Sequence, residues 1–345
     1  MRIPSGGRPV KDVGEFQLID ALTAALAGSG QDRLKLGIGD DAAVWTPGPG
    51  RDLVATADML VENVHFQLDW TEWRNLGHKA LAVNLSDIAA MGAVPHIALV
   101  SIGLRGSERD REIIELYQGM QGLAHECGVS IAGGDISASA VLTIAITVIG
   151  ESPGGGRRVM TRSAARPGDV LAVTGPIGLA AAGLRVVEQG LNVLDGSPAM
   201  REAFTRPQPQ IAQGRIMAYA GVRAAMDLSD GLLGDLPKLC GMSDVSAVVD
   251  LPLLPIPASV RWAFTDWSDL ALRGGEDYEL LFACPHVVFE RVCRHFRRFR
   301  LREPVRIGEI TEPGEHGPIV RLRDAAGQQR DIESGGFSHF GENGS

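Results

Sequence analysis

The stretch IALVSIGLRGSERDREIIELYQGMQGLAHECG, residues 97–128, decides the fold class, because it joins a strand-like run to a helix-like one. Residues 97–104 form an apolar run, and the following segment has a helix start signal at Ser107-x-x-Asp110 and a natural stop at Gly128. Another strand-like run, VLTIAITVIG at 141–150, comes next. Strands that alternate with helices predict an α/β or α+β layer architecture.

The region before this stretch shows the same alternation. LVATA at 53–57 is strand-like, and the spacing of apolar residues predicts a helix near 15–27. Residues 71–92, TEWRNLGHKALAVNLSDIAAMG, read as one helix with Thr71 as N-cap and Gly92 at its end.

The segment ESPGGGRR at 151–158 is the strongest interruption in the middle of the chain, and a new strand, DVLAVTG, follows it. We therefore expect two domains, residues 1–150 and residues 151–345. In the second, patterns predict helices around 177–190, around 208–220 and from Leu232, and strands into Met226 and near 246–250, 278–283 and 304–310. A chain of 345 residues is long for a single core, which also favours two domains.

Composition excludes several classes of protein. A hydrophobic content of 45% and a charged content of 22% are those of an ordinary globular protein. The net charge of −9 argues against a nucleic-acid partner, whose phosphates favour a basic face. No run is long and apolar enough for a membrane span and no secretory signal is visible, so we expect a cytoplasmic protein. Four scattered cysteines, without a CxxC pair, indicate neither a zinc site nor a disulfide framework.

Acidic residues recur where strand-like runs end, which is where α/β proteins place ligand sites. They are Asp58 after LVATA, Asp135 in IAGGD, Asp227 and Asp230 in MDLSDG, and Glu276 and Asp277 in RGGEDYELLF. Each taken alone is also an ordinary turn or cap residue, and Asp230 in particular has the sequence of a cap for the helix that follows it.

Two further carboxylate positions stand beside these. GIGDD at 37–41 places Asp40 and Asp41 on a glycine-flexed loop, which is either a plain turn or a cation site. Asp87 lies three residues after Asn84 on one face of an otherwise apolar helix, as a solvated edge or as a ligand. Converging in one cleft, these carboxylates would repel one another unless divalent cations lay between them. Oxygen ligands without paired His or Cys favour magnesium over zinc.

Magnesium in an acidic protein suggests a nucleoside triphosphate, yet the usual phosphate cradles are missing. There is no GxxxxGK[ST] loop and no kinase HRD or DFG set. Phosphate recognition would then depend on metal bridges, backbone donors and arginines such as Arg157, Arg158, Arg162 and Arg166, which otherwise form a solvated basic rim. No GxSxG nucleophile elbow is present. His65, seven residues after Asp58, is either a cleft residue or a structural one.

Nine motifs closely resemble, in order, those of the thiamine-monophosphate kinase family. They are GEFQLIDAL, GIGDDAAV, TADMLVENVHF, GHKALAVNLSDIAAMGA, GGDIS, TRSAARPGD, DLSDGLLGDL, GGEDYELLF and GGFSHF, and they run from about residue 14 to about residue 340. The family lies in one superfamily with aminoimidazole ribonucleotide synthetase and selenophosphate synthetase. Its fold implies a two-domain aminoimidazole ribonucleotide synthetase-like α/β chain, whose N-terminal sheet forms a β-barrel across a homodimer.

The resemblance also implies a reaction: ATP phosphorylates thiamine monophosphate to thiamine diphosphate, with several Mg²⁺ ions as cofactors and ATP as co-substrate. The magnesium set it implies is Asp41, Thr56, Ala57 through its backbone, Asp58, Asp87, Asp135, Asp227 and Asp230. It assigns ATP contacts to Gly134, Asp135, Arg162 and Ser229, and thiamine contacts to His65, Glu276 and Phe337. Catalysis is expected to depend chiefly on Asp87, Asp135, Asp230 and Arg162.

One departure from the family pattern is visible, because Ala57 stands where many relatives have a second hydroxyl residue. Rivals within the superfamily lack support: the first cysteine is Cys127, so no reactive Cys stands near the N-terminus as in a selenophosphate synthetase, and the C-terminus is not the cysteine of a hydrogenase-maturation relative. A rival from another class is a non-catalytic magnesium or nucleotide sensor, which a turnover assay separates from an enzyme.

Overall fold

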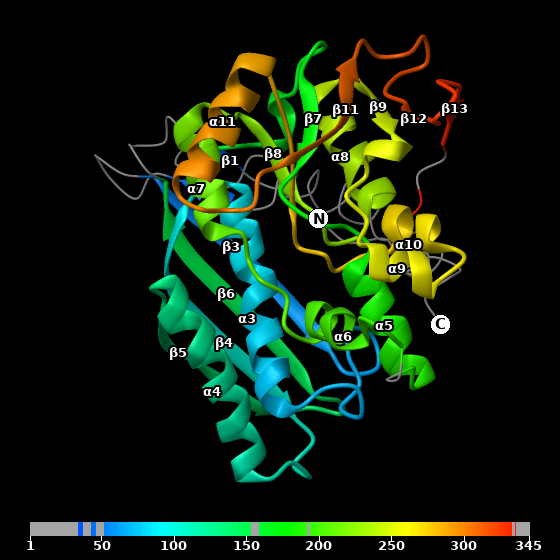
Figure 1. Cartoon of the computed structure of the whole chain (residues 1–345). Helices are drawn as coiled ribbons and strands as arrows, with labels where there is room; N and C mark the ends of the chain where they lie inside the picture. Colours follow the sequence, from blue (N-terminus) through cyan, green and yellow to red (C-terminus); the bar gives the residue numbers. More distant parts are fainter. Residues whose placement is uncertain are drawn as a thin grey trace, which may run out of the picture.

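The computed structural model describes residues 34–36, 43–45, 52–152, 159–191, 194–332 and 335. They form two β-sheets, each with its own helices, and a long helix lies between them (Figure 1). No helix among these residues is long and apolar enough to cross a membrane.

The N-terminal sheet has six strands in the order β1-β2-β3-β6-β4-β5. Their bounds are β1 Leu34–Leu36, β2 Ala43–Trp45, β3 Leu53–Val61, β4 Val94–Leu104, β5 Ser130–Ala138 and β6 Thr143–Glu151. Every neighbouring pair is antiparallel except β4 and β5, which are parallel and are joined by a helical crossover. Two helices, α3 Trp73–Ala90 and α4 Asp110–Cys127, pack against each other beside this sheet.

Alternation along the strands separates the two faces of this sheet. Val100, Ile102 and Ile146 point to the face that the helices cover and are buried. The side chains of the opposite face remain accessible: Met59 is 49% exposed and Leu99 is 40% exposed. The described part of the chain therefore leaves an apolar sheet face uncovered.

The second sheet has seven strands in the order β13-β12-β9-β11-β7-β10-β8. These strands are β7 Val170–Val173, β8 Ala224–Asp227, β9 Ser246–Asp250, β10 Leu280–Cys284, β11 Val305–Thr311, β12 Val320–Arg323 and β13 Gln329–Asp331. The helices of this half are α5 Leu179–Gln189, α6 Ser197–Thr205, α7 Ile211–Ala220, α8 Leu232–Ser243, α9 Ala258–Ala263, α10 Trp267–Arg273 and α11 His286–Arg298, with short 3₁₀ turns at Arg162–Ala164 and Leu251–Leu253.

Helix α3 belongs to both halves of the molecule. Its C-terminal residues Ala89 and Ala90 pack into a cluster with Met217 and Ala218 of α7, and it also contacts β8. The approach is close, since a Cβ added at Gly214 would lie 2.0 Å from the Ala89 carbonyl oxygen. In Figure 1, α3 runs from the N-terminal sheet toward α7 and passes beside α6.

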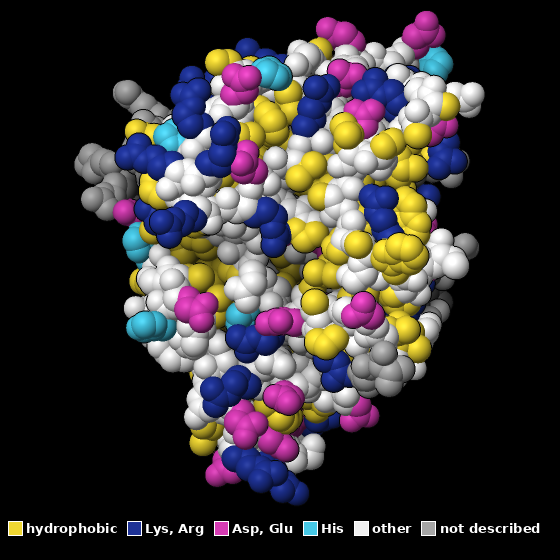
Figure 2. Space-filling view, in the orientation of Figure 1, with side chains coloured by type: hydrophobic (Ala, Val, Ile, Leu, Met, Phe, Trp, Pro, Cys, Tyr) yellow, Lys and Arg dark blue, Asp and Glu magenta, His cyan; other side chains and the backbone are white. Residues whose placement is uncertain are grey.

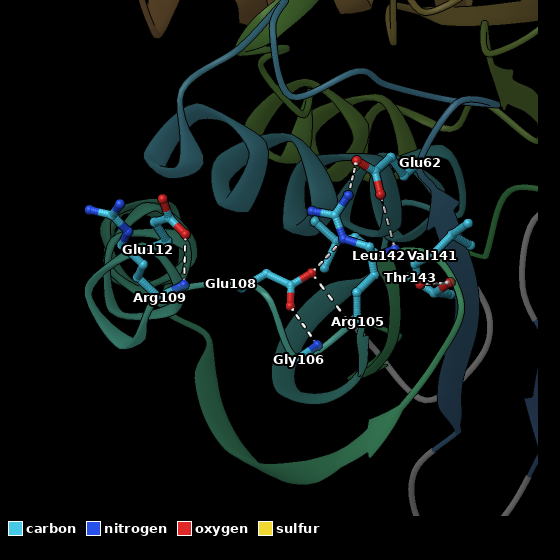
Figure 3. Close-up of polar contacts among 9 residues, drawn as sticks. All are labelled: Glu62, Arg105, Gly106, Glu108, Arg109, Glu112, Val141, Leu142 and Thr143. Atoms are coloured by element: carbon cyan, nitrogen blue, oxygen red, sulfur yellow. Dashed lines mark hydrogen bonds and ion pairs between the residues drawn. The ribbon is translucent and has the colours of Figure 1, made fainter.

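Polar contacts stabilise one end of the N-terminal sheet, where β4 leads into the turn that precedes α4. Arg105 bridges Glu62 and Glu108, with nitrogen–oxygen distances of 2.9 Å and 2.8 Å, and Glu62 also accepts from the Leu142 backbone N–H (Figure 3). The hydrogen bond to Glu108 raises the pKa of Arg105. These bonds hold the ends of β3, β4 and β6 together.

The predicted alternation of strands and helices is confirmed, with corrections at the boundaries. The strand predicted at 53–57 continues to Val61, so Asp58 lies inside it. Thr71 is not the N-cap of α3, which begins after Glu72, and α4 begins after Arg109, whose N–H donates to Glu112. Gly128 ends α4, as predicted, and the structure shows it in the left-handed conformation. The predicted helix at 15–27 lies outside the described residues.

The family-like two-domain α/β architecture is present. The sequence patterns missed several elements, namely β1, β2, α6, α9, α10, α11, β12 and β13, and they had the strand-like run of β5 ending before Asp135. Both sheets are open in the described chain, so the β-barrel expected across a dimer stays a prediction.

Candidate active site at the junction of the two sheets

Helix α3 and strand β3 bring two of the predicted ligands into contact. Thr56 is buried on the helix-facing side of β3, and its hydroxyl donates to Asp87 Oδ2 at 2.5 Å. Asp58, two residues further along the same strand, projects on the same side by alternation but is exposed. Ala57 lies between them in β3.

Ser86, the residue before Asp87 in α3, reaches the other sheet. Ser86 is fully buried, and its hydroxyl donates to Asp227 Oδ2 at 2.7 Å. Asp227 is the last residue of β8, at the strand end where a ligand site was expected. Asp87 and Ser86 thus connect one helix to predicted ligands from both halves of the chain.

Tyr278 shows that carboxylates from distant segments converge. Its phenol is buried, and its pKa is raised well above the ordinary value, first by burial and then by the charges of Glu276, Asp58, Asp227 and Asp230. Three of these four carboxylates were predicted as metal ligands and one as a thiamine contact. Because the charges of all four carboxylates act on the Tyr278 phenol, these carboxylates lie in one region of the molecule.

Two loops meet to build this region. The backbone N–H groups of Glu276 and Tyr278 donate to the carbonyl oxygens of Ser229 and Leu228, at 2.8 Å and 2.9 Å. Contact is so close that a Cβ at Gly275 would lie 2.3 Å from the Ser229 carbonyl oxygen. Glu276 and Tyr278 both have positive φ, +70° and +49°, in the left-handed region that non-glycine residues rarely adopt. Strained backbone of this kind gathers at functional sites.

Asp230 lies in an ionic cluster at the start of α8. Lys238 Nζ is 2.6 Å from Asp230 and 2.9 Å from Asp235, and Asp235 accepts from the backbone N–H groups of Ser229 and Asp230. Burial raises the pKa of Asp235 to about 6. Although burial disfavours a charged ammonium, Asp235 and Asp230 raise the pKa of Lys238 to about 12. The N-cap of α8 is Gly231, and Asp235 rather than Asp230 satisfies the preceding N–H groups.

Asp277 and Glu276 precede strand β10 instead of following a strand, which corrects the expectation for this pair. Asp277 accepts from the Gly178 and Ala180 N–H groups, at 2.6 Å and 3.1 Å, at the N-terminus of α5. This is a structural capping role. Burial nevertheless raises the pKa of Asp277 to about 7.

Asp135 lies apart from this region within one chain. It is exposed on β5, an edge strand, and pairs in register with Ser101, which faces away from the buried Val100 and Ile102. From β3 to β5 there are three strand steps, or about 14 Å. Asp135 also lies inside its strand and not at the strand end. Gly134 beside it has a φ of +157°, and a Cβ there would lie 1.7 Å from the Val100 carbonyl oxygen.

Arg162 begins a 3₁₀ turn that lies against β8 and α8. The Arg162 carbonyl oxygen accepts from Ser243 at 2.6 Å, and the neighbouring Thr161 bridges to Ala224. His65 lies in the turn after β3, where its Nδ1 accepts from the Val61 N–H at 3.0 Å. Asp40, Asp41, Arg157, Arg158 and Phe337 lie outside the described residues.

Within the described ranges, no group of three or more His, Cys, Asp or Glu side chains lies close enough to hold a metal ion. The acidic residues that converge therefore share one region without forming a closed cage among the described residues. Such a region suits a metal ion that completes its coordination shell with water and substrate oxygens.

A cavity elsewhere on the surface does not coincide with these residues. It has a volume of about 550 Å³ and lies between α7 and α11, where Arg215, Arg298, Tyr219 and Phe299 are among its lining side chains. Figure 2 shows Lys and Arg side chains gathered over this part of the molecule. None of the predicted site residues that the structure describes lines this cavity.

Three residues of the junction were missed in the sequence: Ser86, Tyr278 and Lys79. All three lie inside motifs that were recognised, next to or near residues that were selected. A buried serine, tyrosine or lysine has no distinctive spacing, and the partners of Ser86 and Lys79 are 141 and 197 positions away. Only the folded chain identifies them.

Comparison with known proteins agrees with this architecture. The model for "AIR synthase related protein, N-terminal domain" matches residues 39–152, and that for its C-terminal domain matches residues 166–321. A thiamine-monophosphate kinase from Bacillus subtilis (strain 168) is 34% identical over 331 residues, covering 94% of this chain and 99% of the relative.

Solved structures give the same result. AaThiL complexed with AMPPCP and TMP superposes with a TM-score of 0.82 at 29% identity, covering 97% of this chain and 100% of that one. Thiamine-monophosphate kinase from Stenotrophomonas maltophilia K279a gives a TM-score of 0.73 at 35% identity, covering 88% and 95%. With carboxylates from both sheets gathered at their junction, and relatives matched over nearly their whole length, the chain belongs to the thiamine-monophosphate kinase family of the AIR synthase related proteins.

Proposed function

We propose that this protein transfers the γ-phosphoryl group of ATP to thiamine monophosphate, giving thiamine diphosphate and ADP. The observation that carries the proposal is the convergence of Asp58, Asp227, Asp230 and Glu276 around Tyr278, in a chain that superposes over 97% of its length on AaThiL complexed with AMPPCP and TMP. Acidic groups at one cleft suit a reaction between two phosphorylated molecules that metal ions hold together.

The residues fit magnesium. The donors that gather, Thr56 and the carboxylates of Asp58, Asp87 and Asp227, are all oxygens, which Mg²⁺ prefers. Mg²⁺ usually takes one or two carboxylates and completes its shell with water and substrate phosphates, so a closed protein cage is not required. Asp41, Asp135, Asp230 and the backbone of Ala57 complete the proposed set. Bound magnesium supplies neutralisation of the phosphate oxygens as they approach.

The protein itself needs to do little proton chemistry. The attacking group is a phosphate oxygen of thiamine monophosphate, which is already anionic near neutral pH, so no general base is required. This accounts for a site without a catalytic triad or nucleophilic cysteine. We assign Arg162 as an auxiliary cation for the transferring phosphoryl group, and Asp87, Asp135 and Asp230 as the residues on which turnover depends.

Substrate contacts follow the same proposal. Gly134, Asp135, Arg162 and Ser229 contact ATP, and His65, Glu276 and Phe337 contact the thiamine moiety. The Gly134 backbone is suited to lie against a phosphate, because this position excludes any side chain. Truncation of His65 or Phe337 is expected to raise the KM for thiamine monophosphate more than that for ATP.

We further propose a homodimer whose N-terminal sheets close into a barrel, with domains at residues 1–150 and 151–345. The uncovered apolar face that includes Met59, Ile97 and Leu99 supports this, because an exposed apolar sheet face favours association. Asp135 lies on that same face, paired with Ser101. In the dimer, Asp135 and Gly134 therefore serve the cleft of the partner subunit.

The test supplies purified protein with thiamine monophosphate, ATP and magnesium and measures thiamine diphosphate by chromatography. Formation of the diphosphate with an equal amount of ADP is the expected result. ATP binding without turnover would instead favour the non-catalytic nucleotide sensor.

A further inference from the structure

Lys79 is a buried lysine at the boundary between the two halves of the chain. Its side chain is 3% exposed, and Nζ lies 2.7 Å from Glu276 Oε1 and 3.9 Å from the centre of the Phe204 ring. Lys79 comes from α3, Phe204 from α6 and Glu276 from the loop before β10, so three distant segments meet at one ammonium group. A buried ammonium is unfavourable unless an opposite charge compensates it.

The contact between Lys79 and Glu276 is ionic and not a directed hydrogen bond. Among the described residues no acceptor satisfies the geometry of a hydrogen bond to Lys79 Nζ. The Phe204 ring supplies a second favourable surface for the cation, and Trp70 packs against that ring at a centroid distance of 6.4 Å. The ammonium is thereby held in place by its surroundings on more than one side.

Glu276 is restrained at two points. Its backbone is held in the left-handed conformation by the hydrogen bond to Ser229, and its Oε1 is held by Lys79. The Glu276 side chain is 24% exposed, whereas Lys79 is almost fully enclosed behind it. An ionised carboxylate accepts about four hydrogen bonds, so acceptor capacity remains for a ligand.

We propose that Lys79 is a positioning residue for the thiamine site: it holds the Glu276 carboxylate toward the positively charged heterocycle of thiamine monophosphate. This inference rests on the proposed function. Thiamine monophosphate carries a permanently charged thiazolium ring and an amino group on its pyrimidine, and a fixed carboxylate attracts both. Lys79 touches neither substrate and acts through Glu276 alone.

The position of Lys79 on α3 explains how it reaches this loop. Lys79 and Ser86 are seven residues apart, so they lie on the same face of the helix, two turns from each other. Ser86 reaches Asp227 and Lys79 reaches Glu276. One helix face therefore sets the positions of a proposed metal ligand and of a proposed thiamine ligand.

The test is a double-mutant cycle with Lys79→Met, Glu276→Gln and the two together. The dissociation constant for thiamine monophosphate is measured by calorimetry with magnesium and AMPPCP present, and the KM for each substrate is measured by turnover. Each single variant is expected to weaken thiamine monophosphate about tenfold or more, with the KM for ATP within about twofold of wild type. The double variant is expected to bind no more than about twofold worse than Glu276→Gln, since Lys79 acts through Glu276.

Two further variants guard against a trivial result. Lys35→Met removes a lysine that pairs with Asp52 and contacts neither Lys79 nor Glu276 in the described structure, and it is expected to leave both constants unchanged. Phe204→Leu keeps both charges and removes the aromatic ring beside the ammonium. It is expected to weaken thiamine monophosphate binding about threefold and to leave the KM for ATP unchanged, so it tests the inference even where Lys79→Met does not fold. Equal losses for both substrates, or additive effects in the cycle, would overturn the inference.

The inference and the proposed function fail in different ways. Wild-type protein that forms no thiamine diphosphate overturns the function. The coupling of Lys79 and Glu276 is separately visible in thermal unfolding of the ligand-free variants, where the pair is expected to be non-additive. Turnover by the wild type together with additive substrate effects overturns the inference alone.

Discussion

The Thr56 hydroxyl lies 2.5 Å from Asp87 Oδ2, which joins β3 to the C-terminal part of α3. A threonine and an aspartate from separate elements thus present their oxygens together. Replacement of Asp87 by Asn keeps an acceptor for Thr56 but removes the charge. We expect kcat to fall at least about 100-fold with little change in melting temperature, because the charge serves the metal-bound phosphates.

The measurement for Asp87→Asn is turnover over a range of magnesium concentrations, alongside circular dichroism. Asp195→Asn, an exposed aspartate before α6, is the matched control and is expected to behave as wild type. Activity of the Asp87 variant within a fewfold of wild type would remove this residue from the site.

Asp135 is predicted to act across the dimer, because its side chain lies on the opposite face of the sheet from the Thr56–Asp87 contact. Asp135→Asn and Asp87→Asn are each expected to be inactive alone. A mixed dimer of the two, isolated with two different affinity tags, would contain one intact site and one doubly altered site. We expect about half the activity of a wild-type dimer, and an inactive mixed dimer would mean that both residues serve the same subunit.

Leu99 is predicted to lie in the dimer interface. It is 40% exposed on the uncovered sheet face, where a charge introduced by Leu99→Asp would be desolvated on association. Light scattering after size exclusion should show monomers and activity should be lost. Ile114→Asp alters a residue that is 55% exposed on α4, and it should leave the dimer intact. Retention of a dimer by Leu99→Asp would place the interface elsewhere.

Glu279 is predicted to make stability depend on pH. Burial raises the pKa of Glu279 to about 7, although Thr174 and Arg302 oppose this. The folded protein therefore retains a proton that the unfolded chain has lost, so stability is greatest below the unfolded pKa and declines as pH rises toward the folded pKa. The decline is at most about 3 kcal/mol, complete above pH 7.

Glu279→Gln removes this decline, because the amide resembles the protonated acid and still accepts from Thr174, whose hydroxyl lies 2.6 Å away. Thermal unfolding of both proteins from pH 5 to pH 8 checks it. The melting temperature of the variant, relative to wild type, should rise with pH, whereas a constant difference would show that Glu279 does not titrate in this range.

The sequence predicted those parts of the fold whose signals are local. The apolar runs of β4 and β6 and the glycine stop of α4 were found because their residues are close together along the chain. Helix α11 was missed, since its arginine-rich outer face and few buried residues, Val292 and Phe296, hide its apolar side. The continuation of β3 through Asp58 was missed because Ala57, Asp58 and Met59 are all exposed, which breaks the alternation of buried and exposed positions there.

The site shows the same division. Motifs identified Thr56, Asp58, Asp87, Asp227, Asp230 and Glu276, which the folded chain brings to one junction. Patterns could not separate Asp277, a helix cap, from Glu276 beside it, because the two differ only in what they face after folding. The separation of Asp135 depends on strand order in the sheet, which no local pattern encodes.

The sharing of α3 between both sheets limits how this protein can vary. Insertion of a single residue near the start of the helix would rotate every later side chain by about 100°. Ser86 would then turn from Asp227 and Asp87 from Thr56 in the same event. A change in the length of this helix before Asp87 therefore removes both contacts together.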